Sequence, residues 1–181
     1  MYTKNVTGQI IFYYAHKDLF EDVQHESAYM CKNLVTKEGE DLSEQFAITD
    51  DEQPMFALCL REALPAIYDK VKVLTHGIND ALYDIITGTN LKNLDPALST
   101  LVVDSSGNYV VIRVNNYGAY NPNDLKLVDS ALQSSIEQGC LAEYYTRVLN
   151  KDLTEISAGN FAAQVMALAL RVVPLRKKSV L

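Results

Sequence analysis

The spacing of apolar positions predicts a chain made mostly of helices. Four segments repeat apolar residues every three or four positions, the period of a helix with one buried face: 17–35, 50–70, 123–149 and 153–173. Thr49 precedes three acidic residues, so it can cap the second helix while Glu52 reaches back to form a capping box. Pro65 lies inside this same helix, and we expect it to kink or split the helix there.

The last two helices are expected to form an antiparallel pair, because only the short Asn150–Lys151 link joins them. Asn121 or Asn123 is the expected cap of the first of the pair, and Asp152 with Glu155 the expected cap of the second. The apolar stripe predicted for the final helix is Leu153, Ile156, Phe161, Val165, Leu168 and Val172.

One stretch predicts strands instead of a helix. LSTLVVDSSGNYVVIRV, residues 98–114, places two β-branched runs on either side of a turn sequence in which Gly107 can take a positive φ. We therefore expect a β-hairpin near 101–114 that projects from the helical body. An exposed loop near 36–47 should turn at Gly39, and the hairpin and this loop are the expected contacts between subunits. Residues 72–98 suit a strand or a helix equally well.

These elements predict an α+β, predominantly helical fold, with a helix-bundle core, a projecting β-hairpin and extended termini. The 181 residues are enough for one domain with a proper core. Within it, residues 1–48 form an acidic N-terminal region with four Lys or Arg against eight Asp or Glu, 49–173 form the helical body, and 174–181 form a basic tail.

Charge narrows the classes of partner. The net charge is −7, so the four cations from Arg171 onward leave −11 on residues 1–170. An acidic body disfavours general coating of nucleic acid, which needs a basic surface.

No apolar run reaches about eighteen residues, so no membrane span is expected. Three cysteines far apart in the sequence suggest buried thiols in a reducing compartment rather than disulfides.

Few residues suggest chemistry. Glu21 and His25 share a helix face, as do Asp22 and Glu26, and such a group could bind a divalent metal. A solvated acidic face explains them more simply.

Two of the cysteines can be weighed in the same way. Cys59 and Cys140 lie on apolar stripes, where a thiol is a small core residue. Either thiol could pair with His16 or His76 as a catalytic nucleophile only if the fold brought the two side chains together. We expect no catalysis, no metal and no cofactor.

The aromatic pair and the C-terminal tail are the candidate interfaces. Neighbouring helical residues point about 100° apart, so one of Tyr144 and Tyr145 should face the core and the other a neighbour or solvent. Pro174 should end the last helix after Val173, leaving either a frayed end or a docking arm whose apolar residues anchor it. The full candidate set is Tyr144, Tyr145, Arg171, Pro174, Leu175, Arg176, Lys177, Lys178 and Leu181.

Three stretches carry a family resemblance: ITDDEQPMFALCLREALPAIYD, DSALQSSIEQGCLAEYYTRVLNKD and ALALRVVPLRKK. With them the chain resembles small head–tail connector or neck proteins of tailed phages of Bacteroides-type hosts, including crAss-like phages. Those proteins often carry a tryptophan followed by a tyrosine where this chain has Tyr144 and Tyr145. Residues 72–98 match nothing in the pattern.

The resemblance implies a structural virion protein that forms a homo-oligomeric ring and bridges the capsid portal and the tail around the DNA channel. Its implied partners are the portal and other neck or tail proteins, with non-specific proximity to DNA and no membrane. Its implied location is the neck of the virion, and the host cytoplasm during assembly. A tail terminator or completion protein, expected to carry more β structure, is one alternative. A small non-viral binding module or enzyme is the other.

Overall fold

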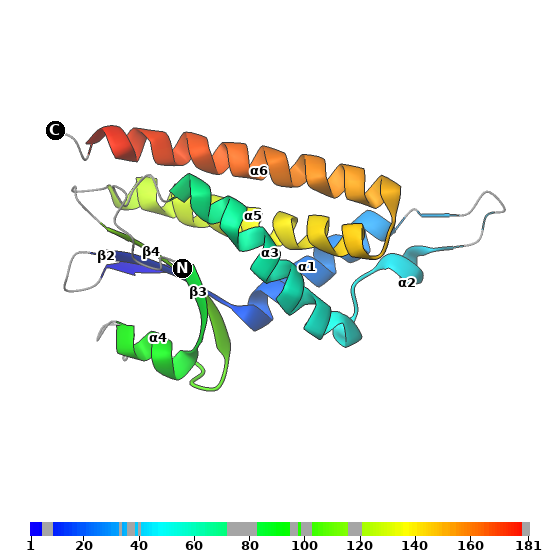
Figure 1. The fold of residues 1–181 in the computed structure, drawn as a ribbon, viewed down its shortest axis with the longest axis horizontal. Helices are drawn as coiled ribbons and strands as arrows, with labels where there is room; N and C mark the ends of the chain where they lie inside the picture. Colours follow the sequence, from blue (N-terminus) through cyan, green and yellow to red (C-terminus); the bar gives the residue numbers. More distant parts are fainter. Residues whose placement is uncertain are drawn as a thin grey trace.

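The computed structural model describes residues 1–4, 9–32, 34–35, 39, 41–71, 83–94, 98, 103–115 and 121–178 (Figure 1). In chain order its elements are β1 Tyr2–Lys4, β2 Gln9–Ala15, α1 His16–Cys31, α2 Ser43–Phe46, the 3-10 turn η1 Asp50–Glu52, α3 Gln53–Val71, β3 Tyr83–Thr87, α4 Gly88–Leu94, β4 Asn108–Asn115, α5 Pro122–Arg147 and α6 Lys151–Lys178. The predicted α+β, predominantly helical fold is confirmed.

The strands form one antiparallel sheet in the order β1-β2-β4-β3. β2 pairs with β4 along its whole length, from Gln9 opposite Asn115 to Ala15 opposite Tyr109. These two central strands are covered on both faces, which explains why residues 10–15 and 109–112 are apolar runs without alternation. The apolar run near the N-terminus is therefore an inner strand of the sheet.

The sheet lies between two helical layers. One face packs on the main helices through the alternate residues of β2 and β4, which are Ile10, Phe12, Tyr14, Val110, Ile112 and Val114. The other face packs on α4 and nearby residues through Ile11, Tyr13, Tyr109 and Val111. In Figure 1, α4 lies below the sheet while α1, α3, α5 and α6 lie above and beside it.

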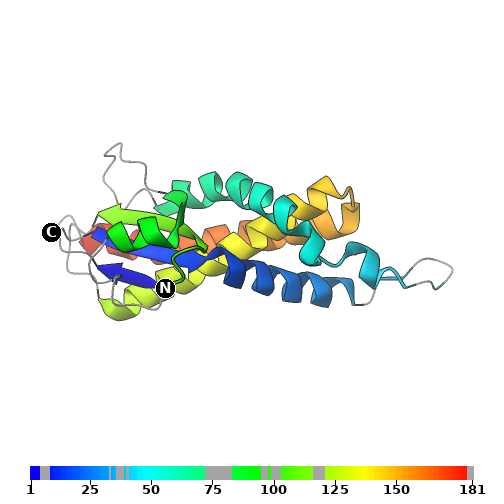
Figure 2. The same cartoon turned by 90° about the horizontal axis from the view of Figure 1, so that it is seen from below.

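Helix α5 is the centre of the bundle, because α1, α3 and α6 all pack against it. Figure 2 shows these four helices running along the long axis of the molecule. Gly139 lets α5 come close to its neighbours: a Cβ atom there would lie 2.7 Å from Ala63 Cβ on α3 and 3.0 Å from Phe161 Cε2 on α6. Gly159 on α6, by contrast, has no atom within 4 Å of such a Cβ position.

The hairpin prediction is half right. The turn is present: Asp104 Oδ1 accepts from the Ser106 amide at 2.9 Å, and β4 starts at Asn108. However, β4 does not project from the body, since it lies between β2 and β3. Most of the expected first arm, 99–102, lies outside the described residues, and Val103 is not in a strand.

Pro65 and Pro174 do not end the helices in which they lie. α3 continues through Pro65 to Val71, so the helix is not split. α6 continues through Pro174 to Lys178, so the prediction that the chain leaves the helix after Val173 is wrong. A proline removes one backbone hydrogen bond from a helix, and packing on either side of the break can maintain the helical path.

The caps follow the sequence in two of three places. The capping box forms, with the Thr49 amide donating to Glu52 at 2.7 Å. Asn121 caps α5 through the Asn123 amide at 2.9 Å. The cap of α6 is neither Asp152 nor Glu155 but Asn150, whose side chain accepts from the Leu153 amide at 3.0 Å.

The loop turn at Gly39 and the segment 72–98 complete the fold. Gly39 has the expected positive φ of 86°. In the segment 72–98, for which the sequence left strand and helix open, β3 and α4 cover residues 83–94, and residues 72–82 and 95–97 lie outside the described residues.

Candidate functional site

The outer side of α6 is an apolar surface that the described part of the chain leaves uncovered. One side of this helix is buried against the rest of the protein through Leu153, Ser157, Leu168, Val172 and Leu175. The opposite side is also apolar, and we call it the outer stripe: Ile156, Gly159, Ala163, Met166, Leu170 and Val173. These residues are spaced by three or four positions, so they share one face of the helix.

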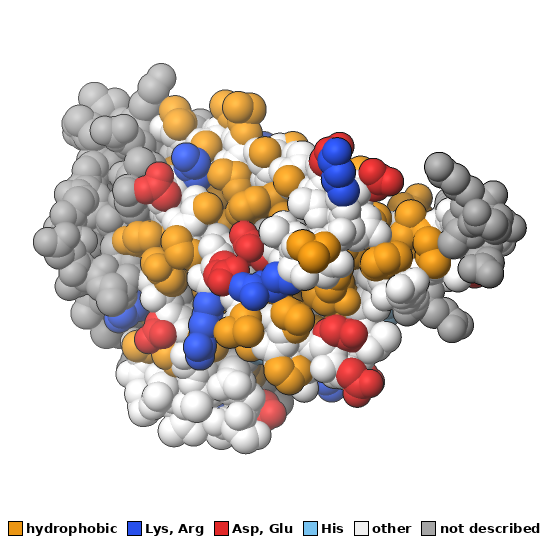
Figure 3. Space-filling view, turned by 45° about the vertical axis from the view of Figure 1, so that its right-hand side comes forward, with side chains coloured by type: hydrophobic (Ala, Val, Ile, Leu, Met, Phe, Trp, Pro, Cys, Tyr) orange, Lys and Arg blue, Asp and Glu red, His pale blue; other side chains and the backbone are white. Residues whose placement is uncertain are grey.

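The outer stripe is exposed. The exposed fractions are 54% for Ile156, 68% for both Met166 and Leu170, and 48% for Val173. No Asp, Glu, Lys or Arg occurs between positions 156 and 170. In Figure 3, hydrophobic side chains gather on the upper part of the molecule, where α6 runs in Figure 1. Covering a large apolar side chain completely contributes about 1.5–3 kcal/mol, so this stripe favours contact with another surface.

Helix α6 is also the one described helix that is long and apolar enough to cross a membrane, judged by length and composition over Lys151–Val173. Only 17% of its most apolar window is buried in the protein. The sequence prediction of no membrane span depended on an unbroken apolar run, whereas α6 is apolar on average with polar residues interspersed. Length and composition do not distinguish a membrane from a protein partner.

Tyr144 and Tyr145 are both buried inside the protein, so neither side chain is available to an outside partner. Tyr144 and Tyr145 are exposed by only 4% and 0%, so the prediction that one of them faces outward is wrong. Helix α5 is surrounded by three helices, and adjacent residues can therefore both be buried. The Tyr145 hydroxyl lies 3.4 Å from Cys31 Sγ, and the two rings of the pair meet edge to face at 5.3 Å.

Much of the predicted C-terminal tail belongs to α6. Leu175 is 0% exposed and belongs to the main core, so it is not an anchor waiting for a neighbour. Arg171 is exposed on α6. The backbone of Arg176, Lys177 and Lys178 continues the helix, and Leu181 lies outside the described residues.

The residues considered for chemistry remain apart. Glu21 pairs with Lys17 at 3.6 Å, and within the described part of the chain no three His, Cys, Asp or Glu residues are grouped to hold a metal ion. His16 packs its ring against Phe56 at 4.9 Å, and burial lowers the pKa of its imidazole. His76 lies outside the described residues.

All three cysteines are buried and free, as predicted. Burial raises the pKa of Cys59 to about 11 and raises that of Cys140 well above its ordinary value. Both thiols therefore stay protonated at neutral pH, and a protonated thiol is a poor nucleophile.

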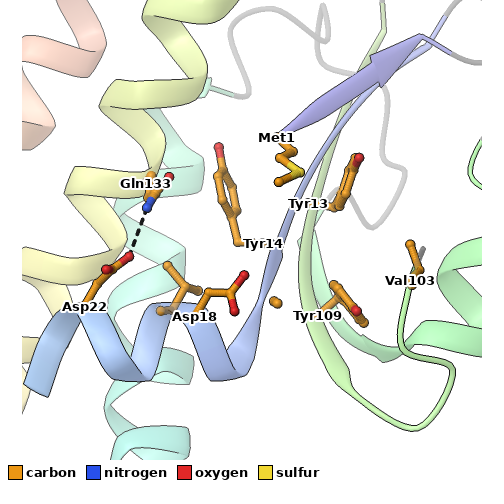
Figure 4. A pocket seen from close by; sticks show the side chains of 10 residues that line it. Met1, Tyr13, Tyr14, Asp18, Asp22, Val103, Tyr109 and Gln133 are labelled. Atoms are coloured by element: carbon orange, nitrogen blue, oxygen red, sulfur yellow. Dashed lines mark hydrogen bonds between the residues drawn. The ribbon is translucent and has the colours of Figure 1, made fainter. Parts of the chain in front are cut away.

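A cavity of about 500 Å³ opens between β2, β4, α1 and α5 (Figure 4). We call it the tyrosine cavity, since three tyrosines line it together with two acids and an amide: Tyr13, Tyr14, Tyr109, Asp18, Asp22 and Gln133. The amide of Gln133 donates to Asp22 Oδ2 at 3.2 Å. The acidic oxygens and aromatic rings suit a small hydrogen-bond donor or cation.

Two phenols in this cavity stay protonated. Burial raises the pKa of Tyr14 well above its ordinary value, and the Asp129 carboxylate raises it further. The Tyr14 hydroxyl donates to Asp129 Oδ1 at 2.8 Å. Burial and the Asp129 charge also raise the pKa of Tyr13. These tyrosines can donate hydrogen bonds, but they cannot act as bases at neutral pH.

Comparison with known proteins adds no assignment: no protein-family model, no curated protein and no solved structure matches this chain.

The outer stripe was missed in the sequence because both sides of α6 are apolar. The predicted core stripe included Ile156, which is in fact more than half exposed. The signal was present in two features: a second series of small and apolar residues at the same spacing, and fifteen consecutive positions without a charge.

Proposed function

We propose that this protein is a structural subunit of the head–tail junction of a tailed phage, where it forms part of a ring that joins the portal to the tail around the DNA channel. The resemblance of residues 48–69, 129–152 and 167–178 to connector proteins suggests the role. The observation that carries it is the outer stripe of α6, an apolar face that the isolated chain leaves exposed. Assembly proteins need such a face.

Charge is compatible with the same role. Residues 1–170 carry −11, since the four cations of the C-terminal segment are part of the total of −7. An acidic wall repels phosphate. A channel lined by such a wall lets DNA slide without binding it.

The test is disruption of the gene in the phage that carries it, followed by complementation. We expect the disrupted phage to accumulate filled heads that lack tails, and the wild-type gene to restore complete particles. The variant Met166→Glu with Leu170→Glu should fail to restore them, because two charges on the outer stripe oppose burial. Leu127→Glu with Leu149→Glu is the matched control, since both residues are exposed hydrophobics that lie off the stripe.

Two results would count against the proposal. Complete, infectious particles without the gene would exclude a role at the junction. Rescue by the stripe variant would leave the outer stripe without a role in assembly. Each variant is checked for folding by its thermal melt before the particles are examined.

The four-stranded sheet supports a second candidate, a tail terminator or completion protein, which was expected to carry more β structure than a hairpin. Separation of free heads from free tails distinguishes the two. A connector should be found with heads through the portal, whereas a tail terminator should be found with tails.

A further inference from the structure

We infer that α6 of one molecule pairs in antiparallel orientation with α6 of a second copy, through the outer stripe. The pair forms in the free protein in solution, and it does not depend on a role in a phage. It follows from the spacing, size and charge of the residues on one face of one helix.

The spacing is that of a helix made to pack lengthwise on another. The intervals along the outer stripe are three, four, three, four and three residues, from Ile156 to Val173. Their average of 3.4 residues is close to the repeat of about 3.5 that keeps one seam facing a partner helix. A helix that only packs on its own core needs one such face, and α6 already has a buried one.

The sizes of the residues fit an antiparallel pair. With the two-fold axis midway between Ala163 and Met166, these two residues lie opposite each other, and Gly159 lies opposite Leu170 of the partner subunit. Ile156 then lies opposite Val173 of the partner subunit. In the two inner pairs a small residue faces a large one, so the side chains can interdigitate there. A parallel pair would instead place glycine opposite glycine and methionine opposite methionine.

The charges select the same orientation. The start of α6 is net acidic, with Asp152 and Glu155 against Lys151, and its end is basic from Arg171 onward. An antiparallel pair brings the acidic end of each helix to the basic end of the other, whereas a parallel pair brings like charges together. Opposite macrodipoles also align favourably in the antiparallel pair.

A membrane suits the same surface less well. The charge-free part of α6 runs from position 156 to position 170, which is about 22 Å of helix at 1.5 Å per residue. The hydrocarbon core of a bilayer is about 30 Å thick. In addition, Leu168 and Val172 are fully buried in the protein, so α6 would have to leave its own core to cross a bilayer.

A two-fold pair closes on itself and cannot extend into a ring. If the protein also forms the ring proposed above, the α6 pair is the form that protects the outer stripe before assembly. A single helix pair gives a small interface, so we expect dissociation in roughly the micromolar range.

The first part of the test is the size of the protein over a wide range of concentration, by light scattering and sedimentation. We expect a monomer–dimer equilibrium for the wild type. Met166→Glu with Leu170→Glu should weaken the dimer by on the order of 100-fold or more, because two charges from each copy would be buried. Leu127→Glu with Leu149→Glu should leave the equilibrium unchanged.

The second part tests orientation by disulfide cross-linking. The double variant Ile156→Cys with Val173→Cys should oxidise to a covalent dimer, because each new thiol lies opposite the other one in the partner subunit. Within one chain the two positions are about 26 Å apart along the helix, so they cannot bond to each other. Ile156→Cys alone and Val173→Cys alone should remain monomers under the same conditions. The three natural cysteines are buried and do not compete.

Several outcomes would overturn the inference. A monomer at every concentration would exclude the pair, and a covalent dimer of Ile156→Cys alone would show a parallel pair. Binding of the wild type, but not of the stripe variant, to phosphatidylcholine vesicles would assign the stripe to a membrane. A larger ring without a dimer would overturn the α6 pair while supporting the proposed function, so the two ideas can fail separately.

Discussion

At the scale of single residues, two glycines in neighbouring helices have opposite surroundings. A Cβ on Gly139 would lie 2.7 Å from Ala63 Cβ, whereas a Cβ on Gly159 would meet open space within 4 Å. Gly139→Ala should therefore destabilise the protein by up to about 2 kcal/mol, because overpacking costs about 1–3 kcal/mol and the gain in helix propensity offsets only about 1 kcal/mol of it. Gly159→Ala should stabilise it by about 0.5–1 kcal/mol. Urea unfolding in dilute solution measures both, and equal shifts would contradict the packing argument.

Glu137 is a residue whose charge opposes folding. Burial raises its pKa, and the nearby carboxylates of Asp22 and Glu26 raise it further, while a hydrogen bond from Gln133 acts in the opposite direction. A raised pKa means that the folded state holds the proton more tightly than the unfolded chain. The resulting stabilisation is present below the ordinary pKa of 4.5 and is lost as the pH rises through the folded value.

The variant Glu137→Gln should therefore melt at a higher temperature than the wild type at pH 7, and the difference should shrink as the pH falls toward 4. Glu21→Gln, at an exposed position of α1, is the matched control that makes the same substitution without a buried group. Thermal melts from pH 4 to pH 8 test the prediction. A difference independent of pH would mean that the proton of Glu137 is not involved.

At the scale of elements, the sequence predicts those features that depend on neighbours in the chain. Thr49 and Glu52 form their capping box, and Asn121 caps α5, because capping joins residues only two or three positions apart. The sheet depends on contacts of a different kind. β2 pairs with β4 across about a hundred residues, and nothing local in the apolar run of β2 indicates that partner. Hence the turn before β4 was predictable and the position of β4 within the sheet was not.

The end of α6 was mispredicted for a related reason. Pro174 favours an end to the helix locally, but Leu175 beyond it is fully buried in the main core. Leu175→Ala should therefore destabilise the isolated protein by about 2–5 kcal/mol, the usual cost of removing a buried leucine side chain. Val173→Ala, at a residue that is 48% exposed, should change stability by less than about 0.5 kcal/mol. If Leu175→Ala leaves the melt of the isolated protein unchanged, the helix does not dock as described.

At the scale of the whole molecule, the dependence on long-range packing also explains why the exposed apolar surface lies on α6 and not at the predicted tyrosine pair. The tyrosines were expected at an interface, but α5 is enclosed by α1, α3 and α6 and both of them are buried. The exposed apolar face belongs instead to α6, the helix at the edge of the bundle (Figure 1). Which of two apolar faces turns inward depends on the packing of all the helices. Periodicity within one helix cannot decide it.

The α6 pair also has a consequence for the stability of the whole molecule. A folded dimer that separates on unfolding is stabilised by mass action, so its melting temperature rises with protein concentration. We expect this rise for the wild type, and for Leu127→Glu with Leu149→Glu. Met166→Glu with Leu170→Glu should melt at a temperature independent of concentration, because it remains a monomer. In dilute solution it should approach the wild-type value, since Met166 and Leu170 are 68% exposed and contribute little to the fold of one chain. A wild-type melting temperature that does not change with protein concentration would show that no second copy covers the outer stripe, and it would contradict the α6 pair.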